Sequence, residues 1–131
     1  MTQIRISEAA LLLGVSDDTV RRWIDTGLLT AGVDSSNRKV IEGRELAEFA
    51  QSSAIPPPDP TGGHTSARNR LVGLVTKVTS DLVMSQVEMQ CGPFRVVSLM
   101  STEAVGDLGL EPGVVAVAVV KATTVIVEAA N

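Results

Sequence analysis

The sequence predicts an α+β protein of two domains, a helix-turn-helix domain followed by a five-stranded, partly open β-barrel. Three features of its composition support this. Residues 1–51 are rich in charge and carry apolar residues at helical spacing. Residues 52–65, SSAIPPPDPTGGHT, are expected to form an extended, semi-rigid linker without regular structure. In residues 66–131, valine and alanine alternate with polar residues between turn signals, which is typical of short strands.

Two short helices are predicted to open the first domain. Ser7 is expected to cap a helix over EAALLL, and Gly14 to end it. Ser16 is expected to cap a second helix, which Gly27 closes; its first turn carries aspartates, favoured there by the helix dipole. The short, glycine-containing connection between them is typical of a helix-turn-helix.

A hairpin and a third helix complete this domain. Residues 28–41 place two short apolar ends around the turn-rich tip DSSN, which predicts a hairpin. Residues 43–51, GRELAEFAQ, predict the third helix. We expect the buried side of the first two helices to consist of Ala10, Leu11, Leu13, Val20, Trp23 and Ile24.

The second domain is predicted to be mostly strands. We expect five of them, near residues 70–79, 82–90, 95–100, 113–120 and 124–128. A Gly-Pro turn joins the second and third strands, and one short helix, capped by Ser101 or Thr102, lies within residues 101–110. Five short strands with one helix suit an open barrel of the oligonucleotide/oligosaccharide-binding (OB) type.

Composition excludes several classes of function. The net charge of −4 gives no global basic field, so any DNA contact must come from a local patch. One tryptophan, two phenylalanines and no tyrosine argue against a stacking platform for single-stranded nucleic acid. Cys91 is the one cysteine, which leaves no disulfide framework and no metal-ligand spacing. The one histidine, His64, lies in the linker, so acid–base catalysis has almost no candidates and we expect no enzyme.

No targeting or membrane segment is expected. The N-terminus MTQIRISEAA lacks the basic and then apolar layout of a signal peptide. The longest apolar run, residues 113–120, is far short of the ~20 residues that span a bilayer. The sequence therefore predicts a cytoplasmic protein with no membrane partner.

The first domain carries a motif of DNA-binding proteins. The run S-x-x-T-V-R-R-W, followed by G-L-L and the basic NRK hairpin, resembles the winged helix-turn-helix of mercury-resistance-regulator (MerR) and excisionase-type domains over residues 3–51. Such a domain places polar residues of its second helix against DNA, and hairpin cations against phosphate or the minor groove. The resemblance implies double-stranded DNA as a partner, with candidate residues Ser16, Asp18, Thr19, Arg21, Arg22, Arg38 and Lys39.

An alternative is a charged, solvated helix in a protein-interaction module. Residues 1–51 hold six basic side chains against eight acidic ones, a poor balance for tight DNA binding by one copy. DNA binding is therefore expected only from a multimer that presents several copies.

Two similar clusters flank the predicted sheet of the second domain. TSARNRL, residues 65–71, and VKATTV, residues 120–125, each join small and hydroxyl residues to a cation. With SLMSTEAVGDLGLEPG, they resemble the Mop-type (TOBE) domain of molbindins and molybdate-responsive regulators over residues 65–129. That family binds molybdate or tungstate. The resemblance implies that the two clusters meet across subunits, so that one chain carries two half-sites of a shared oxyanion site. The implied site residues are Ser66, Ala67, Arg68, Asn69, Ser101, Lys121, Ala122 and Thr123.

The roles in that site follow from what a doubly charged tetrahedral anion needs. Arg68 offers a forked donor and Lys121 a compact charge, while small residues let backbone N–H groups approach. Relatives carry a second hydroxyl where this chain has Ala104, so one donor is lost unless Thr102 substitutes. Asn69 is expected to tie the first strand as often as to touch the ligand. The alternative is that Arg68 and Lys121 only pair with Glu103 or Glu128 on the surface.

Together these features predict a molybdate-sensing transcriptional regulator of molybdenum uptake or cofactor genes. The resemblance implies a homo-oligomer, a dimer or a trimer of dimers, with the hexamer favoured because residues 1–51 offer no dimerising coiled coil. Two other readings stay open. One is a molybdate storage protein whose first domain binds another protein, and the other is a binder of a pterin cofactor.

Overall fold

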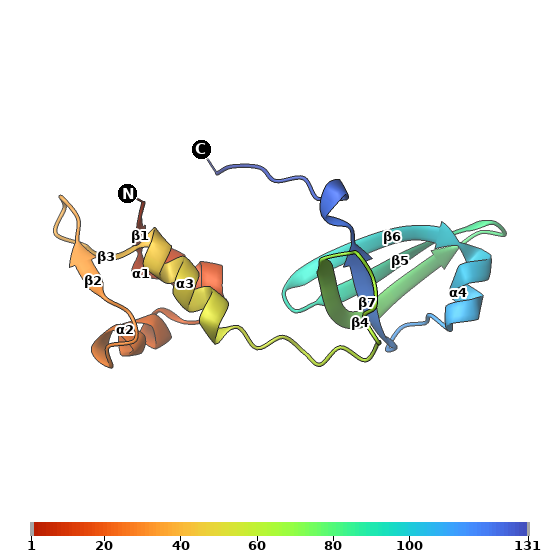
Figure 1. The fold of residues 1–131 in the computed structure, drawn as a ribbon, viewed down its shortest axis with the longest axis horizontal. Helices are drawn as coiled ribbons and strands as arrows, with labels where there is room; N and C mark the ends of the chain where they lie inside the picture. The colour runs from red at the N-terminus through yellow and green to blue at the C-terminus, as the bar shows by residue number, and fades with distance from the viewer. Residues whose placement is uncertain (1, 131) are drawn as a thin grey trace. The chain divides into compact units, whose positions relative to one another are not determined.

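The computed structural model describes residues 2–130 and divides the chain into two compact units, with the division between Ile55 and Pro56 (Figure 1). Residues 56–65 of the proline-rich segment are thus grouped with the second unit. The limits at residues 51 and 65 stay a prediction from composition.

The first unit is helical with a small sheet. Its elements are β1 (Gln3–Arg5), α1 (Ile6–Leu13), α2 (Asp17–Asp25), β2 (Ala31–Val33), β3 (Lys39–Glu42) and α3 (Gly43–Ser53). The three strands form an antiparallel sheet in the order β1-β3-β2, so the predicted hairpin is present and gains a third strand. The turns after α1 and before α2 follow the prediction, with Gly14 in the left-handed region (φ 69°) and Ser16 accepting a hydrogen bond from the Thr19 N–H.

Two expectations for the first unit were wrong. Ser7 is not a cap, because pairing of β1 with β3 keeps the chain extended as far as Arg5 and α1 begins at once at Ile6. Leu11 is 84% exposed instead of buried. The apolar face of α1 runs through Ile6, Ala9, Ala10 and Leu13, which are spaced by three and four residues, and Leu11 lies outside that stripe.

The core of the first unit joins all three helices to the sheet. Its fully enclosed side chains include Val20 of α2, Leu29 before β2 and Ile41 of β3. Trp23 packs on Phe49 of α3 with ring centroids 4.8 Å apart at 55°, a tilted arrangement that aromatic pairs favour. The apolar face of α2 is thereby held against the core, and its polar side chains lie on the surface.

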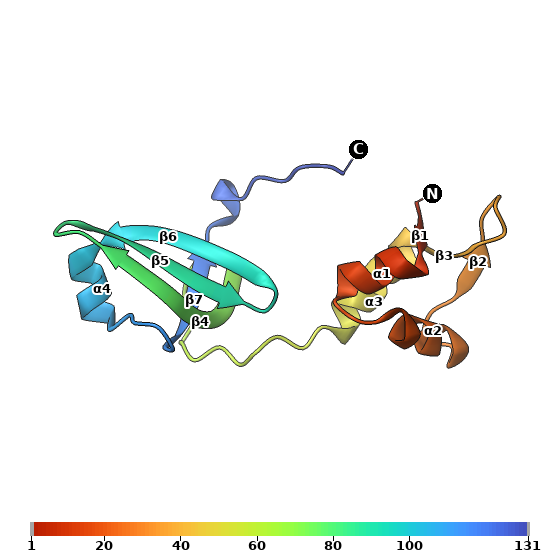
Figure 2. The same cartoon turned by 180° about the vertical axis from the view of Figure 1, so that it is seen from behind.

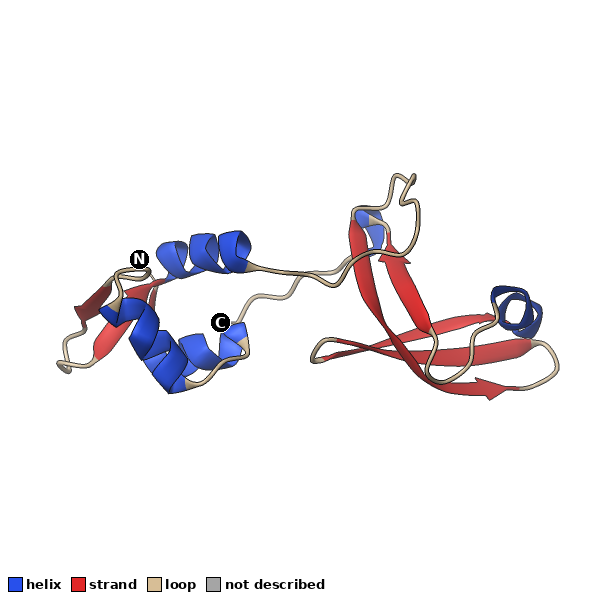
Figure 3. Ribbon diagram, turned by 90° about the horizontal axis from the view of Figure 1, so that it is seen from below, coloured by secondary structure: helices blue, strands red, loops and turns tan. Residues whose placement is uncertain are grey.

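The second unit is a curled four-stranded sheet with one helix. Its elements are β4 (Asn69–Ser80), β5 (Met84–Cys91), β6 (Phe94–Ser101), α4 (Thr102–Leu108), β7 (Val115–Val120) and the single 3₁₀ turn η1 (Ala122–Thr124). The strands pair antiparallel in the order β6-β5-β4-β7, which gives a half-barrel (Figures 1 and 3).

The predicted fifth strand, residues 124–128, does not form in this chain. The backbone turns through η1 directly after Lys121, and residues 125–130 continue without regular structure and exposed to solvent. β6 and β7 therefore remain the two edges of the sheet. Beside them opens a mostly apolar groove of about 450 Å³, lined by Val87, Met89, Met100, Leu110 and the length of β7.

Two strands of the half-barrel approach closely at Gly73. A Cβ built on Gly73 would lie 2.3 Å from the Gln90 carbonyl oxygen and 2.7 Å from Cys91 Sγ. Those distances are far below van der Waals contact, so only glycine fits at this point of β4. A register shift between Val75 and Lys77 follows, which adds curl to the strand.

Candidate functional site

The two cationic clusters lie at the same end of the β4–β7 ladder. Asn69, the first residue of β4, is the register partner of Val120, the last of β7, and its Nδ2 donates to the Val120 carbonyl at 3.2 Å. Asn69 thus ties β4 to β7, which is one of the two roles expected for it. The tie places residues 66–68 and 121–123 at the same end of the sheet within one chain, whereas the resemblance implied that the two clusters meet across subunits; Figure 3 shows η1 beside the start of β4.

The charged groups of these clusters are exposed. Ser66, Arg68, Lys121 and Thr123 all face solvent, and among residues 2–130 no ion pair includes Arg68 or Lys121. The pairing with Glu103 or Glu128 that was the alternative is therefore not formed within the described chain.

The alanines of the clusters differ from each other. Ala67 is only 6% exposed, and its N–H donates to Thr65 Oγ1 at 3.3 Å, so this donor already has a partner. Ala122 begins η1, whose own hydrogen bonds run from the Thr124 and Val125 N–H groups to Lys121 and Ala122.

Ser101 lies at the opposite end of the sheet. It ends β6, pairs with Met84 at the start of β5, and caps α4 by accepting from the Ala104 N–H at 3.0 Å. The neighbouring pair is Ser80–Ser85 at the far end of β4, and this strand of 12 residues has a contour length of roughly 36 Å. Figure 2 shows α4 at the end of the sheet away from η1. One chain therefore does not bring Ser101 to Arg68 and Lys121.

Thr102 cannot stand in for the missing hydroxyl donor in this conformation. Its Oγ1 donates to the Asp81 carbonyl at 2.8 Å, so it accepts from Ser85 Oγ at 2.9 Å. Ser85 in turn accepts from Ser80 Oγ at 2.7 Å. Every hydroxyl proton of this row, in which only Ser85 is buried, is used, and the row holds the β4–β5 turn onto the start of α4.

The candidate DNA-binding residues of α2 form a polar patch at its N-terminus. Ser16 and Thr19 bond to each other through their hydroxyls at 3.0 Å. Asp18 and Arg21 form an exposed ion pair at 3.4 Å, which partly neutralises that arginine. Arg22 faces solvent and belongs to no ion pair within residues 2–130.

The hairpin between β2 and β3 presents a second basic group. Arg38 and Lys39 are exposed, and the turn before them is built on Asp34, whose carboxylate accepts the Ser36 and Arg38 N–H groups at 2.9 and 3.0 Å. The Arg38 N–H is the main reason that the pKa of Asp34 is lowered. Sequence reasoning missed Arg5, which β1 places opposite Val40 beside this hairpin; a strand of three residues gives no periodic signal.

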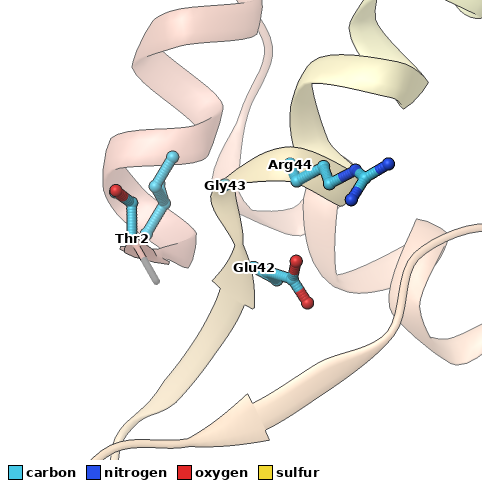
Figure 4. Close-up of a pocket in the computed structure, with 5 residues that line it drawn as sticks. Thr2, Glu42, Gly43 and Arg44 are labelled. Carbon is cyan, nitrogen blue, oxygen red and sulfur yellow. The ribbon is translucent and has the colours of Figure 1, made fainter.

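A further hollow lies where β3 meets α3. It is lined by Thr2, Ile4, Glu42, Gly43 and Arg44, and Figure 4 shows the Glu42 and Arg44 side chains on the side of the β3–α3 junction away from Thr2. The Gly43 N–H donates to the Thr2 carbonyl at 2.8 Å, and Arg44 pairs with Glu48 along α3. The hollow thus has a structural explanation and gathers no reactive group.

Within residues 2–130 no three His, Cys, Asp or Glu side chains gather as a metal site would require. No helix in the described part of the chain has both the length and the apolar character needed to cross a bilayer.

Comparison with known proteins assigns both units. Residues 65–127 match the TOBE domain, and residues 4–54 match a helix-turn-helix domain. Molybdenum-pterin-binding protein 3 of Clostridium pasteurianum is 38% identical over 63 residues, which are 47% of this chain and 93% of that protein.

Two similar solved structures cover the same half of the chain. A molybdate-binding protein from Sporomusa ovata has 32% identity and a TM-score of 0.48, covering 50% of this chain and 97% of its own. MopII from Clostridium pasteurianum has 35% identity and a TM-score of 0.47, covering 50% of this chain and 98% of its own.

Proposed function

Because this chain belongs to the TOBE-domain family, whose relatives bind molybdate or molybdenum-pterin, and carries a helix-turn-helix domain before that domain, we propose that it is a molybdate-responsive, DNA-binding regulator. Its ligand is molybdate or tungstate, its partners are double-stranded DNA and further copies of itself, and it acts in the cytoplasm on genes of molybdenum uptake or cofactor synthesis.

The chemistry of the cationic end suits a doubly charged oxyanion. Arg68 and Lys121 are exposed, and Asn69 joins their two strands, so both charges can reach one ion. A charge-assisted hydrogen bond contributes roughly 1.5–3 kcal/mol, so four or five of them are enough for micromolar capture. Ser66 and Thr123 supply hydroxyls at the same end.

The observation that carries the proposal is the separation of Ser101 from Arg68 and Lys121. Ser101 ends β6, while the cations flank the opposite end of β4 and β7. A site that uses all of them needs the Ser101 end of one copy beside the cationic end of another. The anion then holds copies together, which makes oligomerisation and binding thermodynamically linked.

The same assembly would complete the expected five-stranded OB-type barrel. Residues 124–128 have the alternation of a strand, yet in one chain Val125, Ile126 and Val127 are exposed. The apolar groove beside β7 and the free edges of the sheet offer places for such a strand. Pairing there would bury these side chains and satisfy backbone groups that now face water.

DNA binding is assigned to α2 and the hairpin between β2 and β3. Arg22 presents a free guanidinium and Arg38 with Lys39 a basic tip, as the winged helix-turn-helix reading requires. An oligomer multiplies these weak contacts, which offsets the acidic balance of the domain. The anion can change DNA affinity only by as much as it prefers one assembly over another.

Calorimetric titration tests the oxyanion site. The full chain is titrated with molybdate, tungstate, sulfate and a pterin, and its mass in solution is measured alongside. We expect heat with molybdate and tungstate, and an Arg68→Ala or Lys121→Ala chain should lose at least about tenfold in affinity, since each removes a charged partner. Arg95→Ala, which removes a cation on β6, is the matched control and should bind as before. Heat with the pterin but not with molybdate would reverse the ligand assignment.

A gel shift with the DNA upstream of the chain's own gene tests the regulator. We expect a shifted complex whose amount changes with molybdate and which Arg22→Ala weakens. The excess of acidic residues in residues 1–51 favours the second candidate, a molybdate storage protein whose first domain binds a protein. Molybdate binding without any shift, with or without the anion, would decide for storage.

A further inference from the structure

Arg70 is bonded to a segment that composition alone assigns to a free linker. Its Nε donates to Asp59 Oδ2 at 2.8 Å, and its Nη2 donates to Thr61 Oγ1. Asp59 also accepts from the Thr61 N–H at 2.8 Å and from the Thr61 hydroxyl at 2.7 Å. We call this closed set of hydrogen bonds between Asp59, Thr61 and Arg70 the clasp.

The clasp is more sheltered than the other ion pairs of the described chain. The Arg70 and Asp59 side chains are 23% and 32% exposed. Each of the other ion pairs has at least one side chain that is more than 60% exposed. The Arg70 guanidinium, with help from Thr61, lowers the pKa of Asp59 far below its usual range.

A short loop connects the clasp to the first cationic cluster. Gly63 has φ 67°, and a Cβ on it would lie 3.8 Å from the Arg70 guanidinium, so the loop passes directly over that group. Inside the loop, the Thr65 N–H donates to the Gly63 carbonyl at 3.0 Å and the Ala67 N–H to Thr65 Oγ1 at 3.3 Å. These two bonds fill the stretch between Gly63, which lies against Arg70, and the residue before Arg68.

We propose that Arg70 is a positioning residue, which, through Asp59 and Thr61, holds residues 62–67 in the conformation that presents Ser66 and Arg68 to the oxyanion. The inference rests on the proposed function of that site and adds a residue to it. We assign Arg70 to the loop and not to the anion, because its Nε and Nη2 donors are engaged by Asp59 and Thr61 and the Asp59 carboxylate neutralises its charge. Asp59 thereby also keeps a second arginine near Arg68 from competing for the ion.

A consequence concerns the tether to the first unit. Since Asp59 and Thr61 are bonded to β4, the chain leaves the half-barrel before Asp59 and not at residue 65. The free part of the linker is shorter than its composition suggests, and it ends at the clasp, next to the loop that the anion would touch.

The test measures hydrogen exchange and binding on the full chain. Variants are Arg70→Ala and Arg70→Lys, with Arg95→Ala as the matched control because it breaks the Glu88 ion pair on the same sheet without touching the loop. Amide exchange of residues 62–67 is followed by mass spectrometry without anion, and molybdate affinity by calorimetry. Unchanged exchange in β4 and β5 shows which variants keep the fold.

In the Arg70→Ala chain we expect exchange in residues 62–67 to rise about tenfold and molybdate affinity to fall about fivefold to twentyfold. Arg70→Lys should be intermediate, because an ammonium keeps the charge but cannot bridge Asp59 and Thr61 in a fork. Arg95→Ala should change neither quantity.

Two results would overturn the positioning role: loop exchange equal to that of the parent chain, or faster exchange with unchanged affinity. A parent chain that takes up no molybdate would instead overturn the proposed function, and the exchange measurement would still decide whether Arg70 holds the loop. If amides of β4 exchange faster in the Arg70→Ala chain but not in the Arg70→Lys chain, the alanine variant has disturbed the fold. The lysine variant then decides whether Arg70 positions the loop.

Discussion

Single side chains set how the half-barrel responds to acid. Glu88 on β5 is 14% exposed at its side chain and accepts from Arg95 Nε at 2.8 Å. That bond is the main reason that the pKa of Glu88 is lowered. A carboxyl with a lowered folded-state pKa adds stability above its unfolded pKa, and the contribution is lost as pH falls through the folded value.

Glu88→Gln should therefore flatten the acid limb of the stability curve. The parent chain should lose thermal stability as pH falls from about 5 to 3, and the variant should lose less over that range because one linked proton is removed. Scanning calorimetry at several pH values measures this. Glu111→Gln, which removes an exposed carboxylate, is the control, and an equal slope in the parent and Glu88→Gln chains would contradict the role of the pair.

At the scale of elements, the serine that caps a helix, Ser16, can be distinguished by experiment from Ser7, which was expected to cap a helix and does not. Ser16 accepts from the Thr19 N–H at 3.1 Å, whereas Ser7 is exposed inside α1 and caps nothing. Ser16→Ala should cost about 1 kcal/mol of stability, and Ser7→Ala close to nothing. Trp23, the one tryptophan, lies in this unit, so its fluorescence reports the unfolding of the unit in denaturant. Equal losses in both variants would refute the cap assignment.

Two glycines of the half-barrel should respond in opposite directions to alanine. Gly73→Ala forces a Cβ against the Gln90 backbone, so it should destabilise the second unit by about 1–3 kcal/mol. Gly106 lies in α4 with nothing within 4 Å of an added Cβ, so Gly106→Ala should stabilise by about 0.5–1 kcal/mol. Calorimetric unfolding of both chains checks the pair. A tolerated Gly73→Ala would mean that the β4–β5 approach relaxes easily.

Local signals in the sequence predicted these elements well. Gly14 and Ser16 mark real helix ends because the cap chemistry lies within four residues of the chain. Ser7 carried the same type of signal and was wrong, because pairing between β1 and β3, nearly forty residues apart, decides where α1 begins. The strand expected at residues 124–128 is absent although its local pattern is that of a strand, because the sheet order β6-β5-β4-β7 offers it no pairing within this chain.

The candidate site was predictable as a set of residues but not as a geometry. The motifs singled out Arg68 and Lys121, and antiparallel pairing of β4 and β7 explains why both lie at the same end of the sheet. The position of Ser101 at the other end depends on strand order, which spacing in a sequence does not reveal. Asp59 and Arg70 were hidden because a proline-rich segment reads as free linker until its contacts are known.

For the whole molecule, the exposed end of the chain should control assembly. If residues 125–131 add a strand to another copy, a chain that stops at Thr124 should have a lower mass in solution and expose the groove beside β7. Light scattering coupled to size exclusion measures the mass. Ile126→Asp, which places a charge on that segment, should act in the same direction, since burying a charge is costly. A shortened chain of unchanged mass would remove the segment from the interface.

The length of β4 has one more consequence, which concerns the molybdate concentration at which the proposed regulator would respond. Because Ser101 and the two cations lie at opposite ends of β4, the shared site proposed above would be complete only between copies. Its occupancy should then grow with the concentration of the protein as well as with that of molybdate. A strain that expresses little of the protein would then show no regulatory response even in a molybdenum-rich medium. The molybdate concentration at which the response begins would then depend partly on how strongly the gene is expressed.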